Sequence, residues 1–488
     1  TPESSLRFPR PEESMMSYEA LPPWLQNFLP ILILLSAIGI VVARLPKVDV
    51  GHSPEYLRRR LMNWVPLGIA YSMLYFGRYN LSAIAGELDK VGLLPKADFN
   101  EIDGVGAWVY GIAFLINGPI TDRFGGRLTM LVATLGSALV NVGMALVFQG
   151  VNPEQANPAD LKSKLMILNA ANMYLQSFGA VSIVKVNAPW FHVRERGVLG
   201  GLFGILISLG LYFSYDWSLA LARGYGSAAA FWVPAAVLGL CVLSTFLFVK
   251  DSPSTAGFAD FDTGDATSGQ VGRLPFAEVI RRMFSQKVIW IIVAIEFCSG
   301  FLRQAVMKQY RLYSKAVELA DGGTSWVYEH WGMLLCVAGI LGGVFAGFIS
   351  DHVFGSRRGP VSSVLYAGLL LGGLAAFFSL GHPLLGWAVV FMSLCVIGVH
   401  GMLSGTASMD FGGSKNAGVV TGIIDGFVYL GTGTQAFLYA RMLPTGEAAK
   451  DPANWQIWPG AMLPVALVGL LLAASIWNAR PQKAGGGH

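Results

Sequence analysis

The sequence predicts an all-α membrane protein with many transmembrane helices. Of its 488 residues, 53% are hydrophobic and only 13% are charged, whereas soluble domains carry about 25% charged residues. The apolar residues gather in runs of about 20, the length that a helix needs to cross a hydrocarbon core of about 30 Å. These runs are continuous rather than alternating, so a transmembrane β-barrel is not expected.

Thirteen apolar runs predict thirteen spans, with a longer polar interval in the middle of the chain. The predicted spans are residues 25–44, 62–86, 103–121, 127–149, 165–186, 196–221, 228–249, 286–306, 325–350, 360–380, 384–408, 416–440 and 457–478. The corresponding parts are a polar tail (1–24), an extra transmembrane helix (25–45), a six-helix bundle (56–250), a cytoplasmic linker (251–285) and a second six-helix bundle (286–480).

Lysine and arginine indicate the orientation of the spans. If the segment after the first span is cytoplasmic, cytoplasmic segments carry 20 of the 34 basic residues and outer segments carry 12. An excess of positive charge marks the cytoplasmic side. The sequence therefore predicts an N-terminus outside and a C-terminus inside, in an inner membrane of the bacterial type.

The first span is predicted to be an uncleaved anchor. Its basic residues, from Arg44 to Arg60, follow the apolar run, whereas those of a signal peptide precede it. The twelve-helix body that follows is complete without this helix. It is therefore expected to face lipid or to dock a partner subunit that contacts residues 1–50.

Two features recur at nearly the same offset. The turn "GPITDRFGGR" (118–127) resembles "GFISDHVFGSRR" (347–358), and their glycines lie 229 positions apart. Arg78 and Arg303, which both lie inside apolar spans, are 225 positions apart. The repeat predicts two pseudo-symmetric six-helix bundles, each with an arginine at an equivalent depth in its first helix.

The first turn closely matches G-x-x-x-D-R-x-G-G-R, so the chain resembles the major facilitator superfamily over residues 56–480. This resemblance implies two parallel six-helix repeats with a substrate site between them near the membrane midplane. The turn residues are then candidates for gating: Asp122, Arg123, Arg127 and Asp351. Each aspartate is expected to face an arginine or a helix N-terminus across the turn.

An arginine inside a span needs a partner, because a charge near the bilayer centre costs about 2.5 to more than 10 kcal/mol. Arginine keeps its proton and offers a planar fork of donors that suits phosphate or carboxylate. Tyr71 and Tyr75 precede Arg78 by seven and three residues, which places all three on one side of a helix. Arg78 and Arg303 are therefore predicted to be two arms of one anion clamp.

The segment 71–80, "YSMLYFGRYN", also resembles the first helix of the organophosphate:phosphate antiporter branch, which has the pattern Y-x-x-x-Y-x-x-R-x-N. That branch includes the glycerol-3-phosphate and hexose-6-phosphate transporters. The resemblance implies these substrate-binding residues: Arg78, Arg303, Tyr71, Tyr75, Tyr110, Tyr429 and Asn80. Two positions depart from the glycerol-3-phosphate transporters, since Phe114 replaces a lysine and Ile207 a histidine. The identity of the organic part therefore does not carry over.

Two acids inside spans have alternative roles. Glu296 lies seven residues before Arg303, on the same helical face, and could form a permanent ion pair with it or carry a proton. Asp425 precedes Tyr429 by one turn and could face the cavity or steady an arginine. His400 is expected to pack or to bond a backbone group, and Asp216 and Lys308 to lie near helix ends that reach water.

The sequence predicts a secondary transporter that exchanges a phosphorylated organic metabolite, a sugar phosphate or glycerol phosphate, for inorganic phosphate by alternating access. No enzyme, cofactor, metal site or nucleic-acid partner is predicted, because no nucleotide loop, zinc spacing or nucleophile triad is visible. Two alternatives remain: a proton-coupled organic anion symporter, and a non-transporting sensor or assembly subunit with a transporter fold.

Overall fold

The computed structural model describes residues 51–151, 157–192, 205–263, 287–321, 325–349 and 358–478, with five isolated residues elsewhere. The chain divides into two units, Thr1–Lys47 and Val48–His488. Apart from Ser36, the polar tail and the extra helix lie outside the described residues.

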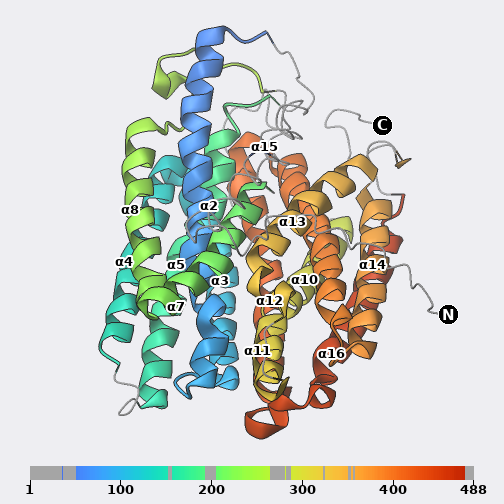
Figure 1. Cartoon of the computed structure of the whole chain (residues 1–488). Helices are drawn as coiled ribbons and strands as arrows, with labels where there is room; N and C mark the ends of the chain where they lie inside the picture. The colour runs from blue at the N-terminus through green and yellow to red at the C-terminus, as the bar shows by residue number, and fades with distance from the viewer. Residues whose placement is uncertain are drawn as a thin grey trace, which may run out of the picture. The chain divides into compact units, whose positions relative to one another are not determined.

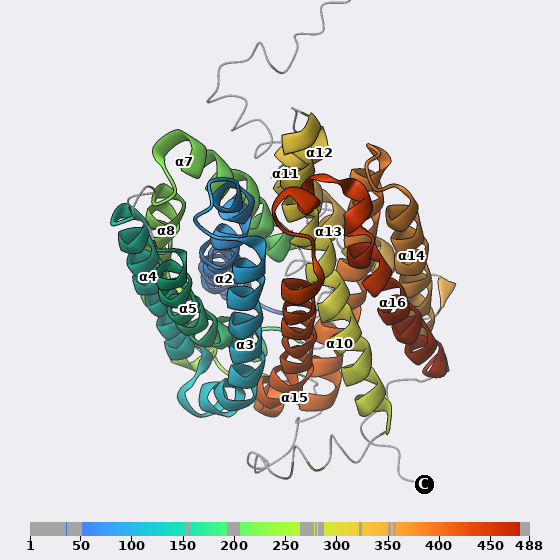
Figure 2. The ribbon, with the colours of Figure 1, turned by 90° about the horizontal axis from the view of Figure 1, so that it is seen from below.

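The described part of the second unit is built from helices, without strands. We call the elements before residue 264 the N half and those from residue 287 the C half (Figures 1 and 2). The N half contains α2 (Pro54–Lys90), α3 (Lys96–Phe124), α4 (Gly126–Gln149), α5 (Pro158–Asn187), the π-helical turn η3 (Phe213–Trp217), α7 (Ser218–Tyr225) and α8 (Ala229–Phe248). The C half contains α10 (Lys287–Met307), α11 (Gln309–Asp321), α12 (Trp326–Glu329), α13 (Trp331–Phe348), α14 (Arg358–Phe378), α15 (Leu384–Met442) and α16 (Ile457–Ser475).

Local sequence explains where two long helices begin. The Ser53 hydroxyl accepts a hydrogen bond from the Tyr56 amide at 3.2 Å, and Pro54 occupies the first turn of α2. The Asn157 side chain likewise accepts from the Ala159 amide, with proline at the start of α5. A capping side chain satisfies an otherwise unpaired amide, and proline there loses no helical bond.

Eight helices in the described part are long and apolar enough to cross a membrane. Two further helices, α2 and α5, are also long, with 37 and 30 residues. The prediction of an all-helical, multi-pass membrane protein is thus confirmed for the described residues. The protein spans its membrane many times, although residues 25–44, apart from Ser36, lie outside what the structure describes.

The predicted spans 384–408 and 416–440 fall within one helical element, α15. Two separate spans predict a break between residues 408 and 416, but this interval is helical too. No proline occurs between Leu384 and Met442, so nothing in the backbone forces the i to i−4 hydrogen bonds to stop there.

Glycines let α3 of the N half approach α15 of the C half closely, and the two helices lie side by side (Figure 2). A methyl group at Gly111 would lie 2.7 Å from the Gly426 carbonyl oxygen, and one at Gly426 would lie 3.0 Å from the Gly111 carbonyl oxygen. The first distance is shorter than real side-chain carbons show, and the second is tighter than nearly all such contacts. Small residues at such contacts let helix backbones pack in a membrane.

We therefore expect Gly111→Ala to destabilise the contact between the halves by about 1–3 kcal/mol, because the added methyl overpacks this contact. The melting temperature of the purified protein, followed by tryptophan fluorescence, should fall. Gly239→Ala in α8 is the matched control, because a methyl there meets nothing within 4 Å. Equal melting temperatures for the two variants would contradict the close approach.

Polar contacts also join the halves near the C-terminal end of α2. The Gln304 amide donates to the Tyr79 hydroxyl at 3.0 Å, and the Gln309 amide donates to Asn100 at 2.8 Å. The Arg311 guanidinium donates to the Ala83 carbonyl at 2.8 Å. In the described part of the protein, this end is where side chains of α2 and α3 meet the helices α10 and α11.

Asp216 contributes a further contact between the halves. Its carboxylate accepts hydrogen bonds from the Gly332 and Met333 amides at 2.7 and 2.9 Å. It therefore caps the N-terminus of α13, where an anion is favourable. Asp216 is half-buried, and the neighbouring half supplies its hydrogen-bond donors, a contact that the sequence did not predict.

Candidate functional site

Arg78 lies in the middle of α2 and is only 4% exposed. Its Nε donates to Gln176 Oε1 on α5 at 2.7 Å, and its Nη1 donates to the Tyr429 hydroxyl on α15 at 3.0 Å. The guanidinium carbon lies 4.6 Å from the centres of both the Tyr75 and Tyr110 rings. Facing aromatic rings stabilise a cation in a dry setting, so these contacts fix the direction of the arginine.

Arg303 lies on α10 in the other half and is 6% exposed. Its guanidinium carbon is 5.5 Å from the centre of the Tyr429 ring. Its Nε and Nη2 have no hydrogen-bond partner in the described part of the chain, and neither does Nη2 of Arg78. Tyr429 therefore contacts both arginines: its hydroxyl accepts a hydrogen bond from Arg78, and its ring lies beside the Arg303 guanidinium.

Neither arginine forms an ion pair with a carboxylate that the structure describes. Buried charges are normally paired. Two buried cations with three unbonded donor groups can instead bind an anion with several oxygens, such as a phosphoryl group. We call Arg78, Arg303 and Tyr429 the clamp.

The other predicted tyrosines extend the wall beside the clamp. The Tyr71 and Tyr75 hydroxyls lie 3.4 Å apart. The Tyr110 ring centre is 4.2 Å from that of Tyr429. Phe114, at the position where the glycerol-3-phosphate transporters have lysine, meets Tyr110 edge to face, with ring centres 4.7 Å apart. The side of α3 next to the clamp is therefore aromatic rather than cationic.

The structure does not bring Asn80 to the clamp. Its amide donates to Asn141 Oδ1 at 2.7 Å and to the Ala230 carbonyl at 3.0 Å, which joins α2 to α4 and α8. Two residues correspond to about 200° of helix rotation, so Asn80 points away from the side that carries Arg78.

Sequence analysis missed Gln176 and Tyr79. Gln176 also donates to Ser137 Oγ at 2.7 Å, so its amide is held in the orientation that presents Oε1 to Arg78. Tyr79 accepts a hydrogen bond from Gln304 across the halves. A glutamine inside the apolar span 165–186 was the available signal, because a buried amide needs partners.

We expect Gln176→Glu to abolish anion binding, because a carboxylate next to Arg78 Nε would neutralise the clamp. Gln176→Leu should weaken binding by about tenfold or more, since a charged hydrogen bond contributes about 1.5–3 kcal/mol. Titration calorimetry with inorganic phosphate measures both effects.

Asn187→Leu is the control for this pair, because it removes a buried amide of α5 that bonds its own helix at the Ile183 carbonyl. Wild-type affinity in Gln176→Glu would mean that Arg78 does not contact the anion.

Glu296 is fully buried on α10, and its Oε2 lies 3.3 Å from His400 Nδ1 on α15. No ion pair between Glu296 and Arg303 is found among the described residues, so the alternative of a permanent bridge between them is not supported. His400 contacts this carboxylate, whereas packing or a hydrogen bond to a backbone group was expected. Asp425 is half-buried on the same helix and interacts electrostatically with His400 and Tyr429.

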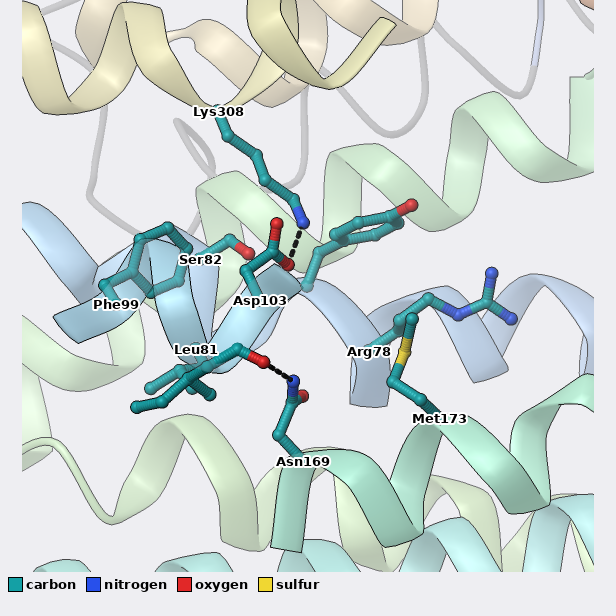
Figure 3. A pocket seen from close by; sticks show the side chains of 10 residues that line it. Arg78, Leu81, Ser82, Phe99, Asp103, Asn169, Met173 and Lys308 are labelled. Atoms are coloured by element: carbon teal, nitrogen blue, oxygen red, sulfur yellow. Dashed lines mark hydrogen bonds and ion pairs between the residues drawn. The ribbon is translucent and has the colours of Figure 1, made fainter. Parts of the chain in front are cut away.

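A small cavity with both polar and apolar lining residues borders Arg78 on the side toward the C-terminal end of α2 (Figure 3). It comprises about 280 Å³, including space open to solvent, and its lining includes Tyr79, Asn169 and Met173. Lys308 reaches across it from the C half to an ion pair with Asp103. Lys308 is 4% exposed, so the expectation that it reaches water at a helix end was wrong.

The signature turn lies at the far end of α3. Gly125 has φ +92°, a conformation that glycine adopts without strain. The Asp251 carboxylate accepts from the Arg127 amide at 2.8 Å, and the Arg127 side chain donates to the Phe246 carbonyl at 2.7 Å. These bonds fasten the turn to the end of α8.

Asp122 pairs with a lysine, Lys185 of α5, at 2.7 Å, where an arginine or a helix N-terminus was expected. Arg123 is exposed, and its guanidinium lies 5.6 Å from the Phe124 ring centre. Asp351 lies outside the described residues. The gating role of these residues stays a prediction.

Two groups of membrane helices with a buried cationic site between them define a membrane transporter fold rather than an enzyme. The chain belongs to the Major Facilitator Superfamily, whose model matches residues 67–435. This match confirms the family that the signature turn indicated. It also supports the prediction that the protein is not an enzyme.

Relatives and a solved structure agree with this assignment. The chain is 24% identical to the glycerol-3-phosphate transporter of Bacillus subtilis, over 88% of this chain and 95% of the relative. It is 23% identical to the membrane sensor protein UhpC of Salmonella typhimurium, over 81% and 88%. The crystal structure of a D-xylose-proton symporter superposes with a TM-score of 0.59 at 16% identity, covering 87% of this chain and 98% of that one, which supports the fold. The relatives match the organophosphate:phosphate antiporter branch that the motifs indicated.

Proposed function

We propose that the protein exchanges a phosphorylated organic metabolite, a sugar phosphate or glycerol phosphate, for inorganic phosphate. The observation that carries the proposal is the clamp: two buried guanidiniums from opposite halves meet at Tyr429 and keep donors free of protein partners among the described residues. The similarity to a glycerol-3-phosphate transporter supports the same substrate class.

The clamp suggests how binding and movement are linked. Arg78 and Arg303 bind one phosphoryl group from opposite halves, and the anion compensates two like charges. The halves then draw together and reorient around the bound anion, which is alternating access. Without an anion, repulsion between the arginines opposes closure, so the protein exchanges anions rather than leaking them.

The proposed setting is a bacterial-type inner membrane, with the N-terminus outside and the C-terminus in the cytoplasm. The end of the halves that carries the Lys308–Asp103 pair then faces outward, and the signature turn at Gly125 faces the cytoplasm. The basic residues of the cytoplasmic segments support this orientation.

The experiment uses purified protein in lipid vesicles. Vesicles loaded with inorganic phosphate should take up labelled phosphate, and external glycerol 3-phosphate or hexose 6-phosphate should compete. Vesicles without internal phosphate should take up little. Equal uptake into empty vesicles, driven only by a proton gradient, would overturn the exchange and favour an anion symporter.

A sensor that binds the anion without transporting it is the second candidate, because one relative is named a membrane sensor protein. Such a protein would bind phosphate but fail to exchange it. It should also co-purify with a stoichiometric partner that is lost when residues 1–50 are deleted. Purification of an active exchanger without any partner would exclude this candidate.

A further inference from the structure

A buried carboxyl and an imidazole lie beside the clamp without belonging to it. Glu296 is 0% exposed and precedes Arg303 by seven residues, about two turns along the same face of α10. Its Oε2 lies 3.3 Å from His400 Nδ1, whereas its Oε1 has no hydrogen-bond partner in the part of the chain described. An ionisable group inside a membrane span is costly, so such groups are rare and usually mark a functional site.

Among the side chains that the structure describes, few titratable groups from the neighbouring helices face this pair. On α10 the titratable neighbours are Arg303 and Cys298, and on α15 they are His400 and Asp425. From α14 comes Tyr366, whose hydroxyl donates to the Ile295 carbonyl at 2.7 Å. Arg303 is thus the nearby group that always carries a positive charge.

We propose that Glu296 and His400 form a proton-binding site that is coupled to anion binding at Arg303. The proton adds to the carboxylate or the imidazole, and no other bond forms or breaks. The proposal rests on the proposed function, because it assigns a proton to each anion that the clamp carries.

Electrostatics gives the coupling its sign. With Arg303 free of an anion, its positive charge stabilises the Glu296 carboxylate and disfavours a proton there. When an anion occupies the clamp, it compensates Arg303, and the carboxylate then gains a proton more easily. Linkage is reciprocal, so protonation of the pair must increase the affinity of the clamp for the anion.

Each anion therefore crosses with a proton in either direction. An exchange of one anion for another then moves no net protons, which is consistent with the need for internal phosphate. The buried pair lets the site accept a doubly charged anion beside a carboxyl that would otherwise repel it.

The test measures phosphate affinity and proton uptake together. Inorganic phosphate is titrated into purified protein by calorimetry at several pH values, and proton uptake is read in weak buffer with a pH dye. Wild-type affinity should rise as pH falls, by about 5- to 150-fold over the full range. Glu296→Gln, which mimics the protonated carboxyl, should bind tightly and lose most of the pH dependence.

Phosphate itself also titrates over this pH range, but its titration affects the affinity of every variant equally. The difference between the pH profiles of variant and wild-type protein therefore reports the titration of the protein alone. Glu447→Gln is the control, because that exposed carboxylate pairs with Lys450 at the surface and should leave the wild-type profile unchanged. His400→Gln is a second test variant that keeps a donor near Glu296, and its pH profile should shift.

The outcomes separate the two proposals. If wild-type protein binds phosphate but Glu296→Gln and His400→Gln show the wild-type pH profile and proton count, the proton site is wrong and the exchange function stands. If wild-type protein does not bind phosphate, the clamp and the proposed function fail, and the coupling fails with them.

Discussion

Replacing Arg78 or Arg303 with lysine is expected to slow phosphate exchange by about 10- to 150-fold in each case. Lysine keeps the charge but lacks the planar fork, so at least one charged hydrogen bond to the phosphoryl group is lost, at about 1.5–3 kcal/mol. In Arg78→Lys the bonds to Gln176 and Tyr429 are disturbed as well. Initial exchange rates in phosphate-loaded vesicles measure the effect.

Arg441→Lys is the control for this pair, because Arg441 is exposed in the last turn of α15 and lies outside the clamp. Its exchange rate should match that of wild-type protein. Normal exchange in Arg78→Lys or Arg303→Lys would argue against forked binding of a phosphoryl group. Loss of exchange in all three variants would point to a general effect of the substitution.

Asp103→Leu is expected to lower the stability of the protein by about 3–5 kcal/mol, because it leaves Lys308 buried without its carboxylate partner. Lys308→Met should lower the stability by a similar amount, because it leaves the Asp103 carboxylate without its cationic partner. The double variant should recover most of the loss, since replacing both charges with apolar groups is often close to neutral. Melting temperatures of the purified variants, by tryptophan fluorescence, give the comparison.

The double-mutant cycle decides whether the pair matters as a unit. Residues that interact directly show non-additive effects, whereas independent sites add. Simple addition of the two single losses in the double variant would mean that Lys308 and Asp103 do not depend on each other. The single variants should also change exchange rates, because the pair joins the two halves beside the cavity that Arg78 borders.

The sequence alone determined the membrane class, the helical fold and the likeness between the two halves. The length of the apolar runs and the scarcity of charge carry this information, because a membrane excludes backbone polar groups without hydrogen bonds and unpaired charged side chains. It also identified Arg78 and Arg303, since an arginine inside an apolar run is rare and each has a counterpart in the other half. Tyr75 followed from helical spacing, which places residues on one face of one helix.

Only the tertiary structure decided which helix each face meets. Asn80 and Tyr79 both lie beside Arg78 in sequence, yet Asn80 bonds within the N half and Tyr79 bonds Gln304 of the C half. Likewise Lys308 pairs with Asp103, and Glu296 contacts His400, in each case more than 100 positions away along the chain. Helical periodicity fixes directions within one helix, but the rotation and depth of neighbouring helices come from packing of the whole bundle, which a single sequence pattern does not encode.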